Sequence, residues 1–303
     1  MLNYIILLIS FVMLIKGADI FVDKATVIAN RFKVPKFIIG MTIVAIGTSL
    51  PELSVSVQSS LLGLNDMCVA NVVGSNIFNL LMITGTIAMF AVIKIDDFKD
   101  IFRTLYIYLI LFILSLDSRL NFFNGIVMLF VFVNYIMTMI KAKNDIEESS
   151  DETIINESLI KTILIGIVGL VGIVLGGNLV VNSARAIAAS LGMSENLIGL
   201  TVVALGTSLP EYVTSIVAAR KGEMDMAIGN VLGSNIFNIL LVLGIASILS
   251  PISITAFTFI DIIFMITTMI IFILSIANKR ISKINGVIFI LLYISYIGYT
   301  IIR

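Results

Sequence analysis

Two glutamates, Glu52 and Glu211, end the same hexapeptide, Gly-Thr-Ser-Leu-Pro-Glu, which occupies residues 47–52 and 206–211. Both copies lie inside long apolar stretches of the kind that cross membranes. A charged group at the bilayer centre costs about 2.5 to 3.5 kcal/mol on insertion scales, and it is tolerated mainly where it lines a path for ions or substrates. Two such carboxylates in matching positions therefore predict a transport site.

The proline before each glutamate predicts a broken helix. Pro51 has no amide hydrogen, and its ring crowds the carbonyl of Gly47, four residues back, so the helix should open and free main-chain oxygens. Pro210 should act in the same way on Gly206. Thr48 and Glu52 are spaced i, i+4, which places a hydroxyl and a carboxylate on one helix face, and the second hexapeptide repeats this spacing. We expect a cluster of hard oxygen ligands.

The apolar stretch after each hexapeptide carries a polar stripe. Its members recur at i, i+4 and i+8, as Asn71, Ser75 and Asn79 and again as Asn230, Ser234 and Asn238. Small residues beside them, Gly74 and Gly233, permit close helix approach, so we expect the stripes to face the hexapeptides. Ca²⁺ prefers six to eight carboxylate, carbonyl and amide oxygens. The chain has no histidine, which argues against zinc, copper and iron and leaves Ca²⁺ and Na⁺.

The match between the two halves extends far beyond the hexapeptide. One constant offset in residue number, 206 − 47 = 159, relates identical residues without a gap from Gly17 and Gly176 to Gly85 and Gly244. This pattern predicts a duplicated unit. We expect a first repeat at 1–140, an acidic cytoplasmic linker at 141–160 and a second repeat at 161–303.

Composition indicates a polytopic membrane protein. Hydrophobic residues make up 59% of the chain and charged residues 13%, and apolar runs are continuous rather than alternating, which favours helices over a barrel. We expect an all-α fold with ten transmembrane helices near 4–29, 37–62, 67–90, 101–117, 122–140, 161–189, 195–219, 224–249, 256–277 and 284–301. Lys and Arg concentrate in alternate loops, which places both termini outside. Five spans per repeat then give inverted copies, as in many secondary transporters.

The hexapeptides and the following GN..GSNIFN-type segments resemble the signature repeats of the sodium/calcium exchanger branch of the Ca²⁺/cation antiporter superfamily, and the resemblance covers essentially the whole chain. It implies an antiporter that exchanges Na⁺ for Ca²⁺ by alternating access, with the first and sixth helices sliding across the others. It also implies the ligand set for the ions: Glu52 and Glu211 as principal ligands, the side chains of Thr48, Ser49, Thr207, Ser208, Ser75, Ser234, Asn79 and Asn238, and the carbonyls of Ala45 and Ala204.

One position departs from some relatives. Position 238 is Asn, where the potassium-dependent branch of the family carries Asp, and this difference predicts K⁺-independent exchange. Glu52 and Glu211 then supply a charge of −2, which balances one Ca²⁺. If the family's three-for-one stoichiometry applies, exchange moves net charge and is electrogenic, at about 2.3 kcal/mol per charge per 100 mV.

Other functions stay open at this level. A Ca²⁺/H⁺ exchanger is the nearest alternative, and a passive cation channel is a more distant one; an enzyme is not expected. The sequence suggests no cofactor, no nucleic-acid partner and no obligate protein partner, only the lipid bilayer and the transported ions. The acidic run between 145 and 157 reads as a solvated linker. The charged residues of the first span, Lys16, Asp19, Asp23 and Lys24, either pair at a helix end or line an ion path. A prokaryotic cell membrane is the expected location.

Overall fold

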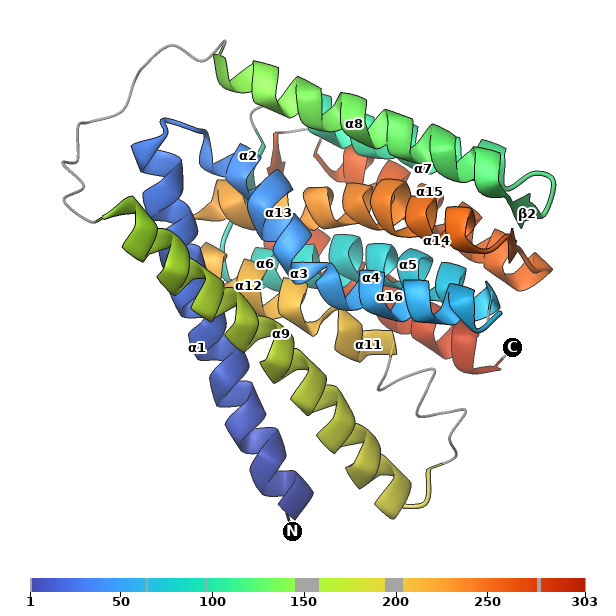
Figure 1. The fold of residues 1–303 in the computed structure, drawn as a ribbon, viewed down its shortest axis with the longest axis horizontal. Coiled ribbons are helices and arrows are strands. Elements are labelled where there is room, and N and C mark those ends of the chain that lie inside the picture. The colour runs from blue at the N-terminus through green and yellow to red at the C-terminus, as the bar shows by residue number, and fades with distance from the viewer. Residues whose placement is uncertain are drawn as a thin grey trace. The chain divides into compact units, whose positions relative to one another are not determined.

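A computed structural model of the chain describes residues 2–63, 65–95, 98–144, 158–193, 204–276 and 279–302. The helices are α1 (Leu2–Arg31), α2 (Lys36–Ile39), α3 (Ala45–Thr48), α4 (Leu50–Leu61), α5 (Asn65–Phe78), α6 (Thr84–Phe90), α7 (Lys99–Leu114), α8 (Phe122–Asn144), α9 (Leu159–Ser190), α11 (Ala204–Thr207), α12 (Leu209–Arg220), α13 (Met224–Phe237), α14 (Gly244–Leu249), α15 (Ala256–Ser275) and α16 (Lys283–Ile302) (Figure 1). Three segments are π-helical: η1 (Gly40–Val44), η2 (Asn79–Ile83) and η4 (Asn238–Leu243). Four two-residue strands complete the described elements: β1 (Ile93–Lys94), β2 (Arg119–Leu120), β3 (Ile252–Ser253) and β4 (Arg280–Ile281).

Several of these helices are long and apolar enough to cross a membrane. Within the described ranges there are 7 such helices, or up to 8 if the broken pair Lys36–Thr48 and Leu50–Leu61 forms one span. The all-helical polytopic fold is thus confirmed, but the expected number of ten spans and the outward termini are not. The expected span at 101–117 corresponds to α7, which has only 16 residues, and the expected span at 195–219 begins outside the described residues.

The described residues form two compact units, and each unit draws on both halves of the sequence. Unit 1 contains Met1–Pro51, Met137–Val231 and Tyr299–Arg303, and unit 2 contains Glu52–Ile136 and Leu232–Gly298. A compact unit and a sequence repeat are different divisions of a chain, so the repeat boundaries at 140 and 161 stay a prediction. Most of the expected acidic linker, residues 145–157, lies outside the described residues.

In unit 1, α1 and α9 pack against each other along glycines (Figure 1). A Cβ atom on Gly17 would lie 2.7 Å from the main-chain nitrogen of Ile173, and one on Gly176 would lie 2.8 Å from the nitrogen of Leu14. Residues of increasing number in α1 contact residues of decreasing number in α9, so the two helices are antiparallel. Only glycine allows main chains this close, as in small-residue packing between membrane helices.

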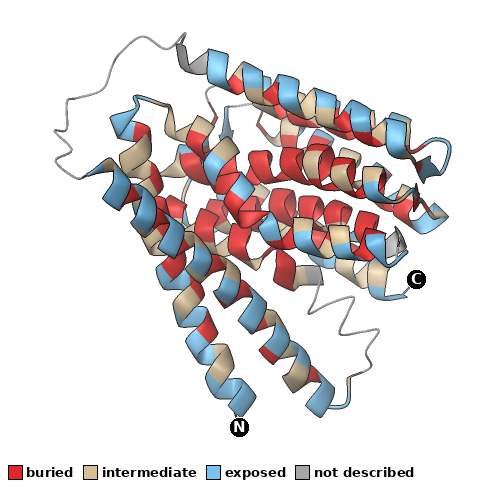
Figure 2. Cartoon of the chain, viewed as in Figure 1, coloured by how far each residue is buried: buried red, intermediate tan, exposed pale blue. Residues whose placement is uncertain are grey.

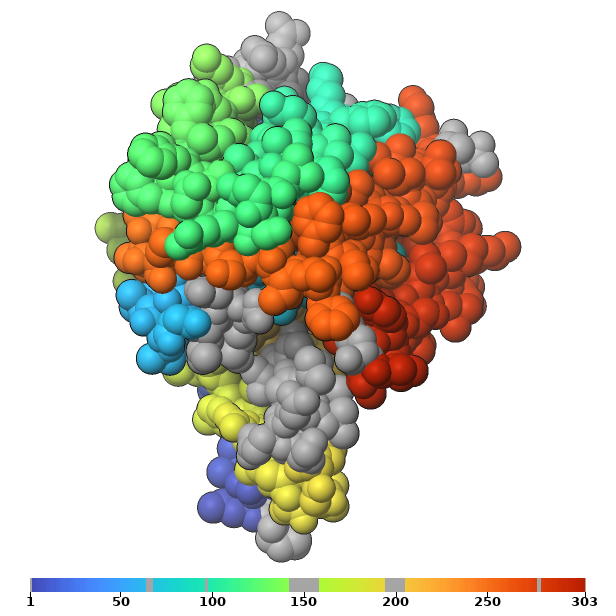
Figure 3. All heavy atoms as spheres, turned by 90° about the vertical axis from the view of Figure 1, so that its right-hand side faces the viewer, coloured from blue at the N-terminus to red at the C-terminus, as the bar shows by residue number. Residues whose placement is uncertain are grey.

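In unit 2, buried residues concentrate in α5, in the unit's part of α13 and in the π-helical turns that follow them (Figure 2). Ile77, Leu80, Ile236 and Leu240 are fully buried there. Helices α7 and α15 cover this core, with the rings of Phe112 and Phe259 5.3 Å apart, and the segments near residues 100–136 (green) and 250–275 (orange) adjoin on the face in Figure 3. Two antiparallel ribbons, β1 with β4 and β2 with β3, join segments from the two halves of the sequence.

Large apolar side chains point outward from many helices. Leu8 of α1, Phe130 of α8, Val168 of α9 and Leu291 of α16 are each more than half exposed, and pale blue runs along the outer faces of these helices in Figure 2. A water-soluble monomer rarely exposes so many apolar side chains on long helices. A lipid bilayer is the solvent that such faces require.

Candidate functional site

Each hexapeptide breaks its helix at the serine. Helix α3 ends at Thr48, Ser49 adopts φ −85° and ψ 8°, and α4 resumes at Leu50 with Pro51 in its first turn. The second copy does the same, since Ser208 has φ −87° and ψ 3° and α12 begins at Leu209. Proline is tolerated in the first turn of a helix because no intrahelical acceptor exists there for the missing amide hydrogen. The predicted breaks are confirmed.

The break also places both glutamates in the first turn of a helix, Glu52 in α4 and Glu211 in α12. Both side chains are fully buried. The amino-terminal end of a helix carries a partial positive charge that stabilises a nearby carboxylate, typically by about 0.3 to 1 kcal/mol. The i, i+4 spacing of Thr48 and Glu52 spans this break, since Thr48 ends α3 and Glu52 lies in the first turn of α4.

Unit 1 holds Glu211 among neutral oxygen groups. The Ser49 hydroxyl donates to Glu211 Oε1 at 2.8 Å. The Thr48 hydroxyl donates to Asn230 Oδ1 at 3.2 Å and lies 3.4 Å from the carbonyl oxygen of Ala45. The latter oxygen also accepts the main-chain amide of Ser49 at 3.1 Å. Segments from the two halves of the sequence thus meet within one unit around a buried carboxylate.

Unit 2 holds Glu52 in a similar way. The Ser75 hydroxyl donates to Glu52 Oε1 at 3.2 Å. Ser75 Oγ in turn accepts a hydrogen from Asn238 Nδ2 at 3.3 Å. A hydrogen bond to a charged acceptor contributes more than a neutral one, about 1.5 to 3 kcal/mol. The carboxylate therefore stays oriented inside an apolar core.

One pair of contacts is the same in both halves of the chain. Asn71 Nδ2 donates to the Glu52 carbonyl at 3.4 Å and to Ser56 Oγ at 3.1 Å. Asn230 Nδ2 donates to the Glu211 carbonyl at 3.5 Å and to Ser215 Oγ at 2.9 Å. The equivalent residues are related by the offset of the repeat in every case (230 − 71 = 211 − 52 = 215 − 56). These bonds confirm that the first residue of each polar stripe faces the hexapeptide of its own half.

Three amide or hydroxyl oxygens of the expected ligands in unit 2 are buried and yet have no hydrogen-bond partner among the described residues. They are Asn79 Oδ1, Asn238 Oδ1 and Ser234 Oγ. A buried polar atom without a partner costs about 1 to 3 kcal/mol, so its presence in a native fold calls for a reason such as an ion. Within the described part of the chain, no group of three or more His, Cys, Asp or Glu side chains could hold a metal. Any cation bound here would rely on hydroxyl and amide oxygens beside single carboxylates.

The residues expected as ion ligands are distributed over both units. Unit 1 contains Ala45, Thr48, Ser49, Ala204, Thr207, Ser208 and Glu211, and unit 2 contains Glu52, Ser75, Asn79, Ser234 and Asn238. All are buried except Ala204, whose side chain lies outside the described residues. Burial of so many polar side chains is unusual, because most such groups lie at protein surfaces.

Sequence reasoning gave no role to three residues that take part in the hydrogen-bond network of the ligands in unit 2. Asn76 and Asn235 bond to the amides of Asn238 and Asn79, and Tyr108 bonds to Asn235 at 2.9 Å. The repeat itself marks the two asparagines, since they occupy equivalent positions of the two halves. No such signal marks Tyr108, because it lies beyond Gly85, where the constant offset between identical residues ends.

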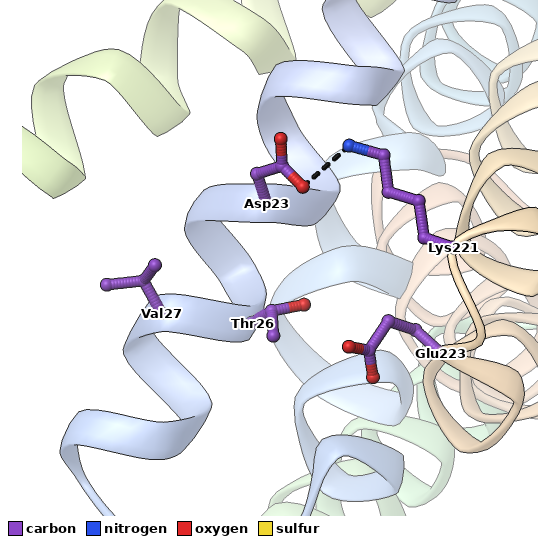
Figure 4. Close-up of a pocket in the computed structure, with 5 residues that line it drawn as sticks. All are labelled: Asp23, Thr26, Val27, Lys221 and Glu223. Atoms are coloured by element: carbon purple, nitrogen blue, oxygen red, sulfur yellow. Dashed lines mark hydrogen bonds and ion pairs between the residues drawn. The ribbon is translucent and has the colours of Figure 1, made fainter. Parts of the chain in front are cut away.

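Two acidic residues of the first span, Asp19 and Asp23, belong to a separate cluster in unit 1, and Figure 4 shows Asp23 beside Lys221. Lys221 Nζ lies 2.7 Å from Asp19 and 2.6 Å from Asp23. Burial lowers the pKa of Lys221, but the hydrogen bonds and charges of the two aspartates outweigh it and leave the pKa above its ordinary value. Asp23, Lys221 and Glu223 line a pocket of about 490 Å³, and Glu223 pairs with Lys36 at 2.7 Å. Asp19 and Asp23 thus pair with Lys221, which directly follows α12, rather than with the lysines of their own span.

Comparison with known proteins gives a consistent result. The family model described as sodium/calcium exchanger protein matches residues 2–141 and 161–302. The chain is 34% identical over 288 residues to the sodium/calcium exchanger MaX1 of Methanosarcina acetivorans, covering 80% of this chain and 82% of that one. It is 34% identical over 255 residues to the inner membrane protein YrbG of Escherichia coli, covering 79% and 78%. A solved structure of the sodium-calcium exchanger NCX_Mj, soaked with zero Na⁺ and Ca²⁺, superposes with a TM-score of 0.88 at 30% identity and covers 99% of both chains.

Proposed function

The chain belongs to the sodium/calcium exchanger family, and from this premise we propose that it is an antiporter that exchanges Na⁺ for Ca²⁺ across a prokaryotic cell membrane. The relatives named above, from Methanosarcina acetivorans and Escherichia coli, are prokaryotic. Glu52 and Glu211 are the principal ligands of the transported ions in this proposal, with the hydroxyl, amide and carbonyl groups predicted from the sequence beside them.

The observation that carries the proposal is the state of the two glutamates. Each is fully buried in the first turn of a helix that resumes after a break, and each accepts a hydrogen bond from a serine hydroxyl. An ionisable group is retained inside a membrane-spanning chain mainly for function. Helix breaks at membrane depth are where transporters expose main-chain oxygens and helix termini to ions.

The chemistry of the neighbouring groups favours Na⁺ and Ca²⁺. Hydroxyls, amides and carboxylates are hard oxygen ligands, and the sequence offers no histidine. Unpartnered oxygens such as Asn79 Oδ1 and Asn238 Oδ1 are buried acceptors that a desolvated cation would satisfy. A resident cofactor plays no part in this mechanism; the ions are the substrates.

The finer features of the proposal come from the sequence. We propose ten spans with both termini outside, transport by alternating access and electrogenic exchange. Exchange would not need K⁺, because position 238 is Asn. The close main-chain packing of α1 against α9 along Gly17 and Gly176 is compatible with sliding of these two helices, which the resemblance implies.

The test is Ca²⁺ uptake into proteoliposomes loaded with Na⁺ and diluted into Na⁺-free buffer. Uptake should require the Na⁺ gradient and should be lost in Glu52→Gln and in Glu211→Gln, which keep the size of the side chain but remove its charge. Glu223→Gln is the matched control, since Glu223 pairs with Lys36 outside the predicted ligand set, and it should retain uptake. Uptake driven only by a pH gradient would instead identify a Ca²⁺/H⁺ exchanger and overturn the proposal.

A further inference from the structure

Two fully buried asparagines of unit 2, Asn76 and Asn235, are absent from the predicted ligand set and yet contact it. Each lies three residues before a π-helical turn, Asn76 before η2 and Asn235 before η4. π-Helical turns occur frequently at functional sites. The first residues of these two turns, Asn79 and Asn238, are predicted ion ligands.

The orientation of the Asn76 and Asn235 amides follows from main-chain contacts. Asn76 Nδ2 donates to the carbonyl oxygen of Asn235 at 3.0 Å, and Asn235 Nδ2 donates to the carbonyl oxygen of Asn76 at 3.3 Å. A carbonyl oxygen only accepts hydrogen bonds, so the nitrogen end of each amide must face it. The Oδ1 atom of each amide therefore points elsewhere and can act only as an acceptor.

These two acceptors hold the amides of the predicted ligands in a crossed pattern. Asn238 Nδ2 donates to Asn76 Oδ1 at 3.1 Å, and Asn79 Nδ2 donates to Asn235 Oδ1 at 3.2 Å. Because an amide carries its oxygen and nitrogen on opposite branches, each bond turns the ligand oxygen away from the asparagine that accepts it. Those two oxygens, Asn79 Oδ1 and Asn238 Oδ1, are among the buried atoms that lack a hydrogen-bond partner within the described residues.

A tyrosine strengthens one side of this arrangement. Asn235 Nδ2 donates its second hydrogen to the Tyr108 hydroxyl at 2.9 Å, and the Tyr108 side chain is fully buried. The buried positions of α15 follow those of α7 at an offset of 161, so the position that corresponds to Tyr108 is Met269, which carries no hydroxyl. The side that holds Asn79 therefore has an anchor that the other side lacks.

We propose that Asn76 and Asn235 are positioning residues: Asn76 fixes the amide of Asn238, and Asn235, anchored by Tyr108, fixes the amide of Asn79, so that both ligand oxygens are presented to the transported cation. This inference rests on the proposed function, since it takes Asn79 and Asn238 as ion ligands. Groups that orient metal ligands typically change metal affinity by about 10-fold to 100-fold when they are removed.

The experiment measures Ca²⁺ dissociation constants of the purified full-length protein by isothermal titration calorimetry, in single and double variants. Asn76→Ala should weaken Ca²⁺ binding by about 10-fold to 100-fold. Its effect should largely vanish in an Asn238→Ala background, where no ligand amide remains to be oriented, and persist in an Asn79→Ala background. The effect of Asn235→Ala should instead largely vanish in an Asn79→Ala background and persist in an Asn238→Ala background. A general structural role predicts instead the same factor in both backgrounds.

Thermal unfolding of each variant, measured in Ca²⁺-free buffer, identifies variants that do not fold. If Asn235→Ala fails to fold, Tyr108→Phe replaces it, since it removes a single hydroxyl beside Asn235. If Asn76→Ala fails to fold, Asn76→Leu, which keeps the size of the side chain, replaces it. Tyr108→Phe should weaken Ca²⁺ binding by about 2-fold to 10-fold, as expected for one hydrogen bond, and only while Asn79 is present.

The outcomes separate the two proposals. Unchanged affinity in Asn76→Ala, or equal factors in both backgrounds, would overturn the positioning role while Asn79→Ala and Asn238→Ala still weaken binding. For Tyr108→Phe, unchanged affinity or an effect independent of Asn79 would do the same. Unchanged affinity in Asn79→Ala, Asn238→Ala and Glu52→Gln together would instead contradict the ligand set of the proposed function.

Discussion

Replacing Asn238 with aspartate tests the donor and acceptor assignments of unit 2 directly. Asn238 Nδ2 donates to Asn76 Oδ1 at 3.1 Å and to Ser75 Oγ at 3.3 Å. In Asn238→Asp, an ionised carboxylate cannot donate a hydrogen bond to Asn76 Oδ1 or to Ser75 Oγ, and it faces the Asn76 oxygen. A protonated carboxyl can still donate one hydrogen bond. The variant should therefore favour the protonated carboxyl in the folded protein.

The size of the effect follows from the bonds that are lost. Each hydrogen bond between neutral groups contributes about 0.5 to 1.5 kcal/mol, so the two bonds of Asn238 together contribute about 1 to 3 kcal/mol. The folded variant binds a proton more readily than the unfolded chain, and its stability should fall as the pH rises. The loss relative to the unchanged protein should approach about 1 to 3 kcal/mol once the folded-state carboxyl is ionised.

The assay is thermal unfolding in Ca²⁺-free buffer between about pH 5 and pH 9, with Ca²⁺ uptake measured over the same range. Asn121→Asp is a matched control, because the side chain of Asn121 bonds only through its oxygen, which accepts from the amides of Phe123 and Asn124 at the start of α8, and aspartate keeps that acceptor. The control should show no added pH dependence. Unfolding and uptake profiles of Asn238→Asp that follow those of the unchanged protein would refute the assigned bonds.

Three further predictions concern packing, charge and ligand binding. Gly169→Ala should destabilise the protein by about 1 to 3 kcal/mol, because its Cβ would lie 2.8 Å from a main-chain nitrogen of α1. Gly298→Ala is the control and should not destabilise it, since a Cβ there would have no atom within 4 Å. Equal unfolding temperatures of the two variants would contradict the α1–α9 contact. Lys221→Gln should cost at most about 1 kcal/mol, as for exposed ion pairs. Because the pKa of Lys221 is raised above its ordinary value of 10.5 in the folded protein, its stabilisation is present below that value and is lost as the pH rises through the folded pKa. Denaturant titrations above about pH 10.5 should therefore show this loss in the unchanged protein and not in the variant. Ca²⁺ at about 100 times its dissociation constant should raise the free energy of unfolding by about 2.7 kcal/mol. The same Ca²⁺ concentration should leave the free energy of unfolding of Glu211→Gln nearly unchanged. Equal stabilisation of the variant and the unchanged protein would count against Glu211 as a ligand.

The helix breaks and the buried acids could be predicted because they depend on local chemistry. Proline cannot donate in a helix interior, and the interruptions at Ser49 and Ser208 follow from Pro51 and Pro210. The stripe residue Asn71 contacts the Glu52 carbonyl as its spacing indicated. These features need only the periodicity of a helix and the cost of burying charge.

Other features depend on packing that no local pattern encodes. The π-helical turns at Asn79 and Asn238 insert an extra residue into a helix whose composition looks ordinary. The crossed bonds of Asn76 and Asn235 join segments from opposite halves of the sequence, and Tyr108 reaches Asn235 from α7. The exact position of the break also depends on packing, since the chain turns at Ser49, two residues before the proline.

Coupling between the two ion fluxes is the property that most directly tests the central claim. Radiolabelled Na⁺ efflux and Ca²⁺ influx would be measured in the same proteoliposomes at a clamped membrane potential. The account predicts that Na⁺ efflux requires external Ca²⁺, occurs in a fixed ratio to Ca²⁺ entry and carries net charge, and that Glu52→Gln and Glu211→Gln abolish both fluxes. Na⁺ leaving without Ca²⁺ entering, or Ca²⁺ entering at the same rate without Na⁺ inside, would contradict it.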